Sequence, residues 1–284
     1  PDLCQFGDVR DIDSLRRSIP ENSSIINLAA EHLDDIKPVS RYHEVNVDGA
    51  HNLCTVAREK KIRTIIFTSS VAVYGFAPVG TGESGVINPF NDYGRTKFEA
   101  EQIFKAWQCE APDERVLVII RPTVVFGEQN RGNVYNLLSQ IVSRRFVMIG
   151  DGQNRKSMAY VENVAAFIEH CLSAAPGAYI YNYVDKPDFT MNQLVMTVKR
   201  ALGRSEIIYL SIPYLLGYWI GKLFDFVSTL TRRKFIVSSI RVKKFCAESV
   251  YSTAVKGTGF IRPVPLAKAL ERTIRHEFVE EHQE

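Results

Sequence analysis

Residues 64–97 decide the expected fold, and they read TIIFTSSVAVYGFAPVGTGESGVINPFNDYGRTK. The first five residues, Thr64 to Thr68, are apolar or β-branched, as is typical of a parallel strand that helices cover on both faces. A loop rich in Gly, Pro and Asn follows, and a helical pattern then runs from Tyr93 to Cys109. The stretch predicts a buried strand, a loop at its carboxyl end and a helix that packs beside it.

The same alternation of short apolar runs and longer helical patterns covers the first two-thirds of the chain. It predicts an α/β fold with a doubly wound, Rossmann-type parallel sheet. We expect residues 1–184 to form the dinucleotide-binding domain, with 122–160 contributing partly to the substrate side, and 185–284 to form a smaller, mostly helical substrate lobe. The other predicted strands are 25–29, 116–121 and 179–184, and the other predicted helices are 42–60, 134–144, 161–174 and 192–202, the last ended by Gly203.

The opening of such a fold normally carries a glycine-rich turn between the first strand and the first helix, which holds the cofactor pyrophosphate. Gly80-Thr81-Gly82 follows no predicted strand and opens no predicted helix. We therefore expect about 30 or more further residues, roughly one βαβ unit, ahead of Pro1. That unit would also carry the acidic residue that distinguishes NAD from NADP, so the sequence leaves this choice open.

The composition argues against several classes of protein. A net charge of +3, with Lys and Arg scattered through predicted helices, does not favour nucleic-acid binding. The five cysteines are far apart and have no metal-ligand spacing, which indicates isolated thiols in a reducing compartment, and no metal is implied. The amino end has no pattern of a secretory signal peptide, so we expect a cytoplasmic protein.

Three polar side chains suggest redox chemistry on an alcohol. Ser70 follows a predicted buried strand, and Tyr93 and Lys97 are four residues apart on one face of a predicted helix. A nearby ammonium favours the phenolate and lowers the pKa of the tyrosine, while a serine hydroxyl can orient the same substrate oxygen. Because the chain has 12 tyrosines and 35 basic residues, a Tyr-x-x-x-Lys pattern alone says little. Its position after the strand-end serine makes it specific.

From about Gly7 to Phe278 the chain resembles the extended short-chain dehydrogenase/reductase family of nucleotide-sugar epimerases and dehydratases. Segments that carry the resemblance include Gly7 to Asp11, Asn27 to Ala30, Val45 to Gly49, Thr68 to Gly75 and Arg121 to Gly127. The resemblance implies NAD as the cofactor and Ser70, Tyr93 and Lys97 as the catalytic residues. It implies cofactor contacts by Asp8, Val9, Leu28, Ala29, Ala30, Asn46, Thr68, Ser69, Tyr93, Lys97, Ile120 and Pro122, and substrate contacts by Ser70, Val71, Arg121, Asn133, Arg155, Lys156 and Arg241.

Simpler roles remain open for some of these residues. Asp8 could be a turn residue, and Asn46 could face solvent from a helix. An arginine such as Arg121 at the end of an apolar strand must find a partner, and either a substrate diphosphate or a nearby carboxylate would serve.

Within the family, the chain is most similar to members that invert C4 of an N-acetylhexosamine carried by undecaprenyl diphosphate, for surface polysaccharides such as the O-antigen of lipopolysaccharide. The Arg-x-Gly-Asp segment with which soluble UDP-sugar epimerases bind nucleotide phosphates has no counterpart, and Arg241, Lys243 and Lys244 occupy its region. Lys156, preceded by Arg155, stands where those enzymes carry an arginine. Diphosphate recognition is therefore expected, while UDP-linked substrates remain an alternative.

Residues 213–233, PYLLGYWIGKLFDFVSTLTRR, predict a wide apolar helix. Lys222, Asp225, Thr229 and Arg232 form one narrow polar stripe. The pattern fits a helix that lies in a membrane interface, with the protein peripheral on the cytoplasmic face, and equally a helix buried against the lobe or a dimer partner. The resemblance implies a homodimer through helices 42–60 and 93–109.

The resemblance implies a 4-epimerase. Tyr93 takes the proton of the sugar 4-hydroxyl, hydride passes to NAD, the 4-keto sugar turns, and hydride returns to its other face. The alternatives are a one-way NAD(P)-dependent 4-ketoreductase or dehydrogenase, and a non-catalytic protein that kept the fold. A 4,6-dehydratase is disfavoured because Val71 and Ala72, not an acidic pair, follow Ser70.

Overall fold

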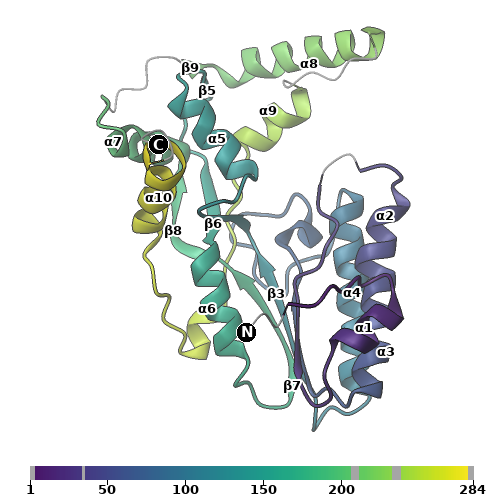
Figure 1. Ribbon diagram of the computed structural model, residues 1–284. Helices are drawn as coiled ribbons and strands as arrows, with labels where there is room; N and C mark the ends of the chain where they lie inside the picture. The colour runs from purple at the N-terminus through teal and green to yellow at the C-terminus, as the bar shows by residue number, and fades with distance from the viewer. Residues whose placement is uncertain (1–3, 34–35, 206–210, 232–237, 281–284) are drawn as a thin grey trace. The chain divides into compact units, whose positions relative to one another are not determined.

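The computed structural model describes residues 4–33, 36–205, 211–231 and 238–280, and its elements are drawn in Figure 1. The chain divides into two compact units. Unit 1 comprises residues 1–123, 163–184 and 252–263, and unit 2 comprises residues 124–162, 185–251 and 264–284. The predicted assignment of cofactor binding to one part and substrate binding to the other stays a prediction.

Unit 1 is built on a four-stranded, wholly parallel sheet in the order β1-β2-β3-β7. The apolar runs form these strands, since parallel strands covered on both faces need apolar side chains on both sides. Helices α1, α3 and α4 pack on one face around Phe67, Phe104 and Trp107, and α6 lies on the other, where Phe167 contacts Tyr181 and Tyr183 (Figure 1). The doubly wound α/β fold is thereby confirmed. The elements are α1 Ile12–Ser18, β1 Ser24–Asn27, α2 Ser40–His43, α3 Gly49–Glu59, β2 Thr64–Thr68, α4 Asp92–Cys109, β3 Val116–Pro122, α6 Val161–Cys171 and β7 Gly177–Tyr183.

The helix predicted over residues 42–60 is interrupted. A π-helical turn, η1 (Glu44–Asp48), separates α2 from α3 and carries Asn46. Single π-turns inside helices often occur at functional sites because the wider turn redirects one side chain. Two short 3-10 helices, η2 (Val71–Tyr74) and η3 (Val255–Thr258), complete unit 1.

Unit 2 contains strands that the sequence did not reveal. Strands β4, β6 and β8 form a mixed three-stranded sheet, and β5 pairs with β9. Helices α5, α7 and α10 bury their apolar faces in one core with this sheet. The elements are β4 Val124–Phe126, α5 Asn133–Val142, β5 Met148–Ile149, β6 Arg155–Tyr160, β8 Asp185–Thr190, α7 Met191–Ala201, β9 Ser211–Ile212, α8 Tyr214–Thr231, α9 Ser239–Cys246, α10 Leu266–Arg275 and η4 His276–Glu280.

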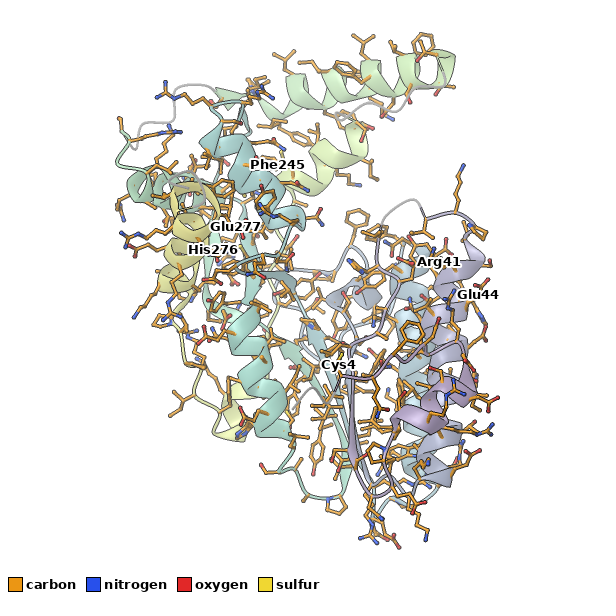
Figure 2. All side chains as sticks on the ribbon, viewed as in Figure 1. Cys4, Arg41, Glu44, Phe245, His276 and Glu277 are labelled. Atoms are coloured by element: carbon orange, nitrogen blue, oxygen red, sulfur yellow. The ribbon has the colours of Figure 1, made fainter. Side chains whose placement is uncertain are left out.

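The end of α10 is fixed by a buried carboxylate. Glu277, labelled in Figure 2, accepts a hydrogen bond from the backbone nitrogen of Gln129 (2.5 Å) and pairs with Arg131 (2.7 Å). A buried carboxylate is tolerated when donors and an opposite charge surround it. The contact ties the carboxyl-terminal helix to the loop that follows β4.

Candidate active site

The amino end of α4 lies directly against the turn that follows β2. Asn91 caps the helix by accepting a hydrogen bond from the backbone nitrogen of Gly94 (3.0 Å). A Cβ atom at position 94 would lie 2.5 Å from the carbonyl oxygen of Ala72, so only glycine permits this approach. Tyr93, the residue before, is thereby held beside η2.

Ser70 and Tyr93 are brought together by this approach. Ser70 is the amino cap of η2, and its hydroxyl accepts a hydrogen bond from the backbone nitrogen of Ala72 (3.1 Å). Burial raises the pKa of Tyr93, and a hydrogen bond with the Ser70 hydroxyl partly opposes that rise. A substrate hydroxyl beside these two groups could exchange a proton with either of them.

Lys97 lies one helical turn after Tyr93 and is only 2% exposed. Its ammonium donates to the carbonyl oxygen of Thr68 (2.7 Å) and lies 4.6 Å from the centre of the Phe67 ring. Burial lowers the pKa of Lys97 to about 7, and the charge of Glu101 opposes that fall. The expected lowering of the Tyr93 pKa by Lys97 is therefore wrong for the chain by itself, because burial raises that pKa, Ser70 supplies the opposing effect, and the ammonium bonds to a backbone carbonyl instead.

Asn46 is buried, so the solvent-facing alternative is wrong. Its amide accepts from the backbone nitrogen of Glu31 (2.9 Å) and donates to the Glu31 carbonyl (3.2 Å) and to the hydroxyl of Thr96 (3.0 Å). Glu31 also pairs with Arg41 (3.1 Å), which is labelled in Figure 2. Both amide protons of Asn46 are thus used to anchor the loop after β1 to α4. A direct contact of Asn46 with a cofactor stays a prediction.

Asp8 lies in a turn and pairs with Arg10 at 2.6 Å. Hydrogen bonds from Arg10 lower the pKa of Asp8 to about 2, so the carboxylate is charged at neutral pH. Val9 packs against Gly49, where a Cβ atom would meet the valine side chain at 2.9 Å. The predicted cofactor contacts of Asp8 and Val9 stay predictions.

Arg121 does not fit its predicted role as a substrate ligand. It is 2% exposed, and its guanidinium binds both carboxylate oxygens of Glu101, at 2.8 and 2.5 Å. It also donates to the Tyr74 hydroxyl (2.7 Å). The nearby carboxylate, not a diphosphate, is the partner that this strand-end arginine required, and we correct the assignment accordingly.

Four further predicted substrate residues belong to unit 2. Asn133 is exposed at the start of α5, and Arg241 lies in α9, where the structure leaves its side chain undescribed. Arg155 pairs with Glu248 (3.0 Å), and the Lys156 ammonium donates to the carbonyl oxygen of Ala247 (2.5 Å). Burial lowers the pKa of Lys156 to about 8. Both basic residues of β6 thus contact the segment that follows α9.

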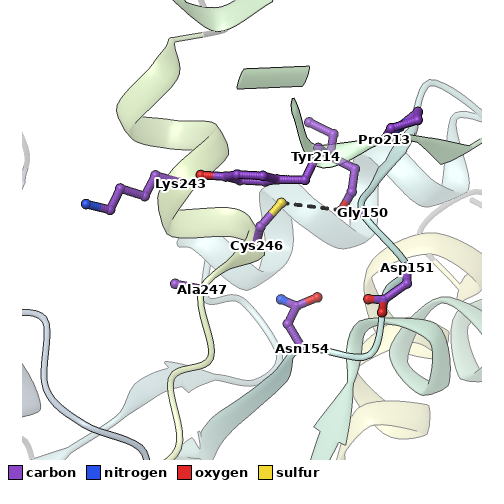
Figure 3. Close-up of a pocket in the computed structure, with 9 residues that line it drawn as sticks. Gly150, Asp151, Asn154, Pro213, Tyr214, Lys243, Cys246 and Ala247 are labelled. Carbon is purple, nitrogen blue, oxygen red and sulfur yellow. Dashed lines mark hydrogen bonds between the residues drawn. The ribbon is translucent and has the colours of Figure 1, made fainter. Parts of the chain in front are cut away.

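A cavity of about 600 Å³ lies beside that segment, within unit 2 (Figure 3). Asn154 comes from the loop before β6, Tyr214 from the start of α8, and Lys243 and Cys246 from α9. The Cys246 thiol donates to the carbonyl oxygen of Ile149 (3.4 Å), the bond drawn dashed in Figure 3. Most of the lining is carbon, with Lys243 as its cation and Asp151 as its anion.

Comparisons with known proteins place the chain in a family. Residues 4–182 match the model of the NAD dependent epimerase/dehydratase family. The chain belongs to the NAD-dependent epimerase/dehydratase family. It is 48% identical over 281 residues to the N-acetyl-alpha-D-glucosaminyl-diphospho-ditrans,octacis-undecaprenol 4-epimerase of Escherichia coli O157:H7, covering 98% of this chain and 85% of that protein. It is 28% identical to a UDP-glucose 4-epimerase of Vibrio cholerae, over 81% of this chain and 73% of that one.

Solved structures of similar fold include other epimerases. The UDP-glucuronic acid 4-epimerase of Bacillus cereus, in complex with NAD, has a TM-score of 0.71 at 16% identity and covers all of this chain, which spans 80% of it. The UDP-glucose 4-epimerase of Thermotoga maritima, with UDP-glucose, has a TM-score of 0.72 at 17% identity, covering 98% of this chain and 84% of that one. At these identities the likeness shows the fold alone.

The residues of unit 1 fit the cofactor named by this epimerase/dehydratase family. Among the described residues, the buried Lys97 ammonium bonds only to Thr68, which leaves two protons that ribose hydroxyls could accept. Leu28 and Ala29 are exposed after β1. The Ser69 hydroxyl donates a hydrogen bond to Glu101 (2.5 Å). Seven of the predicted cofactor residues lie at or just beyond the carboxyl ends of three neighbouring parallel strands, where such sheets bind ligands. These residues are Leu28, Ala29 and Ala30 after β1, Thr68 and Ser69 at β2, and Ile120 and Pro122 in β3.

Sequence reasoning missed four residues that join Arg121 in one hydrogen-bonded network. Glu101 and Tyr74 bond Arg121, Asn182 accepts from the Tyr74 hydroxyl (2.8 Å), and Glu83 accepts from the Asn182 backbone nitrogen (2.9 Å). A sequence pattern could have identified Glu101. Glu101 follows Lys97 by four residues, on the helical face that carries Tyr93.

Proposed function

We propose that this chain catalyses the NAD-dependent inversion of C4 in an N-acetylhexosamine carried by undecaprenyl diphosphate, for surface polysaccharide synthesis. The observation that carries the proposal is the 48% identity, over 98% of the chain, to the undecaprenol-linked 4-epimerase. The meeting of Ser70, Tyr93 and Lys97 at the carboxyl edge of the unit 1 sheet supports it.

The catalytic roles follow from the contacts of these three residues. Ser70 lies close enough to Tyr93 to lower the pKa of the phenol, and it would orient the sugar 4-hydroxyl toward the phenol oxygen. Tyr93 takes that proton as hydride leaves C4 and returns it when hydride comes back to the opposite face. When bound, NAD accepts and returns the hydride, and the positive charge of its oxidised form favours the phenolate that burial otherwise disfavours. Lys97 would hold the ribose and support the same phenolate.

A lipid carrier is favoured by the surface of α8. Gly217 and Gly221 are buried, and a Cβ atom at either position would lie 2.7 Å from Ile149 or from the backbone nitrogen of Ser239, respectively. Asp225, one turn later, accepts from the Ser239 hydroxyl (2.5 Å). The helix therefore packs against the rest of unit 2 through a stripe of small and polar residues spaced by four.

The opposite side of α8 is apolar and exposed. With 3.6 residues per turn, the large side chains opposite that stripe are Leu215, Leu216, Trp219, Leu223 and Phe226, which are 54–70% exposed. Burying such a side chain fully contributes about 1.5–3 kcal/mol, so a few of them could supply much of the ~8 kcal/mol of a micromolar affinity. No helix among the described residues is long and apolar enough to cross a bilayer. We propose that this face lies in the interface of an anionic membrane, beside the lipid substrate. The predicted stripe residue Arg232 lies outside the described residues.

The fluorescence of Trp219 can report membrane binding, because the only other tryptophan of the sequence, Trp107, is fully buried. With phosphatidylglycerol vesicles we expect a blue shift of the Trp219 fluorescence and cosedimentation of the protein. Leu223→Ser with Phe226→Ser should abolish both, while Ile261→Ser, which removes an 87% exposed side chain outside α8, should change neither. Equal cosedimentation of the double variant would refute the membrane proposal, and its conversion from dimer to monomer would assign the face to a second copy.

The catalytic proposal is tested with two substrates. Purified full-length protein should interconvert undecaprenyl-diphosphate N-acetylglucosamine and N-acetylgalactosamine without added NAD(P)H, and should act less well on UDP-N-acetylglucosamine. Equal or better turnover of the UDP sugar would remove the lipid carrier from the proposal. A stoichiometric need for NAD(P)H would favour the reductase alternative, and failure of the purified protein to retain NAD would favour the non-catalytic one.

We also propose the homodimer that the family resemblance implies, through α3 and α4. Sedimentation equilibrium of the full-length protein would test it.

A further inference from the structure

Unit 1 buries a complete ion pair at the carboxyl edge of its sheet. Glu101 of α4 is 0% exposed and Arg121 of β3 is 2% exposed. The guanidinium makes four hydrogen bonds, two to Glu101, one to Tyr74 and one to the Glu83 carbonyl (3.2 Å). Taking two charges out of water costs several kcal/mol each, so such a pair stabilises a fold less than apolar side chains of the same volume would. Stability alone does not account for it.

The pair is continuous with the predicted catalytic residues along one face of α4. Tyr93, Lys97 and Glu101 follow one another at intervals of four and share that face. Facing them are three consecutive residues at the end of β2. The Thr68 carbonyl accepts from Lys97 and the Ser69 hydroxyl donates to Glu101 (2.5 Å). The Ser70 hydroxyl lies close enough to Tyr93 to lower the pKa of the phenol against the effect of burial.

The same pair also holds the far end of the turn that contains Ser70. Tyr74 is the last residue of η2, and its hydroxyl accepts from Arg121 (2.7 Å) and donates to Asn182 (2.8 Å). Ser69 lies immediately before the turn. The turn from Ser70 to Tyr74 is thus attached at both ends to one rigid, bidentate ion pair.

We propose that Glu101 and Arg121 are positioning residues that fix the Ser70 hydroxyl against Tyr93, through Ser69 on one side and Tyr74 on the other. The inference rests on the proposed function, because it requires Ser70 to touch the substrate. Catalytic groups must be held to within a fraction of an ångström, and a misplacement of 1 Å can cost about 100-fold in rate. A bidentate pair between a helix and a strand end supplies such rigidity, which a flexible loop does not.

The test is a double-mutant cycle between Ser69 and Ser70, assayed for C4 inversion. Ser69→Ala removes one hydrogen bond and leaves the ion pair intact. We expect kcat to fall about tenfold with KM unchanged. In a Ser70→Ala background, itself reduced about 100-fold, the same change should cost less than twofold, because the hydroxyl being positioned is gone. A merely structural role would lower activity by the same factor in both backgrounds and would overturn the inference.

Tyr74→Phe provides a second, independent arm at the other end of the turn. It should show the same loss with Ser70 present and the same lack of effect without it. Thr273→Val is the matched control, since the Thr273 hydroxyl is buried but bonds a carbonyl of its own helix (3.0 Å). Its effect should be small and equal in both backgrounds. Full activity of Ser70→Ala would refute the proposed catalytic site and the inference together, whereas a strong Ser70→Ala defect with additive Ser69→Ala and Tyr74→Phe losses would refute the inference alone.

Discussion

Two regions depart from the usual pattern of exposed charges and buried apolar side chains. The Glu101–Arg121 pair buries charged side chains, whereas helix α8 exposes apolar ones. In unit 1 two full charges are at most 2% exposed, while in unit 2 Trp219 and Phe226 are each 67% exposed. Buried charges are tolerated where polar atoms find partners, and each of the three guanidinium nitrogens of Arg121 donates at least one hydrogen bond. An apolar helix face that is exposed among the described residues is typical of a surface that contacts a membrane or a partner. The buried charges are paired within unit 1, whereas nothing in the described part of the chain covers the apolar face of α8.

The largest effect should arise in the buried polar region, at the residue that handles the proton. Tyr93→Phe keeps the ring and removes the hydroxyl, so we expect kcat for C4 inversion to fall about 10⁴-fold, equivalent to about 5 kcal/mol of transition-state stabilisation. Steady-state assays with an unchanged circular dichroism spectrum would establish this. A loss below tenfold would mean that this region is buried for structural reasons only.

The next prediction separates two free energies, the loss of stability when one partner of the ion pair is removed and the net contribution of the whole pair to stability. Glu101→Ala leaves Arg121 buried without its carboxylate, and the free energy of unfolding should fall by about 3–5 kcal/mol. Replacing both residues together, Glu101→Met with Arg121→Met, should restore most of that loss while activity stays low. Urea unfolding of the three proteins measures the difference. A double variant less stable than Glu101→Ala would contradict the view that the pair serves position more than stability.

A smaller effect is expected from pH. Because burial lowers the pKa of Lys97 to about 7, the unfolded chain binds more protons than the folded chain between about pH 7 and the ordinary lysine pKa of 10.5. The contribution of Lys97 to the free energy of unfolding of cofactor-free protein should therefore rise with pH in that window, by up to about 1.4 kcal/mol per pH unit. Lys97→Met should flatten the slope, though not to zero, since burial also lowers the pKa of Lys156 to about 8. An unchanged slope would mean that Lys97 is not desolvated.

The smallest effect on stability is expected at the exposed apolar face of α8. Phe226→Ala on α8 should change the free energy of unfolding by no more than about 0.5 kcal/mol, as for other surface positions. Phe104→Ala, at a fully buried position in the core of unit 1, is the matched control and should cost about 3–5 kcal/mol. Thermal or urea unfolding without lipid would decide. A large loss in Phe226→Ala would show that the chain itself covers this face.

The sequence predicted those parts of the fold that rest on local pattern. The apolar run Thr64 to Thr68 became β2 with the same bounds, and the helix from Tyr93 to Cys109 became α4 with one residue added. The strands of unit 2 were missed because β5 and β9 have two residues each, and β8 includes Lys186, Pro187 and Asp188, which break the apolar pattern.

The predicted catalytic residues were brought together, yet the partner of Arg121 could not be chosen from the sequence. A carboxylate 20 residues away and a substrate phosphate satisfy the same requirement for an anion. Only the three-dimensional packing of α4 against β3 distinguishes them. The predicted direction of the Tyr93 pKa shift was wrong for a related reason, since the spacing of Tyr93 and Lys97 does not reveal how deeply the phenol is buried.

The shared face of α4 limits how the chain can vary in length. Each residue of an α-helix turns the next by about 100°, so one residue inserted between Tyr93 and Lys97, or deleted there, would rotate the ammonium and Glu101 away from β2 in a single step. The loop from Gly75 to Asn91 is held at separate points, since Glu83 bonds Arg121 and Asn182 and the backbone nitrogen of Asn88 donates to the Val73 carbonyl. Relatives should therefore keep α4 at a fixed length from its first turn to its third.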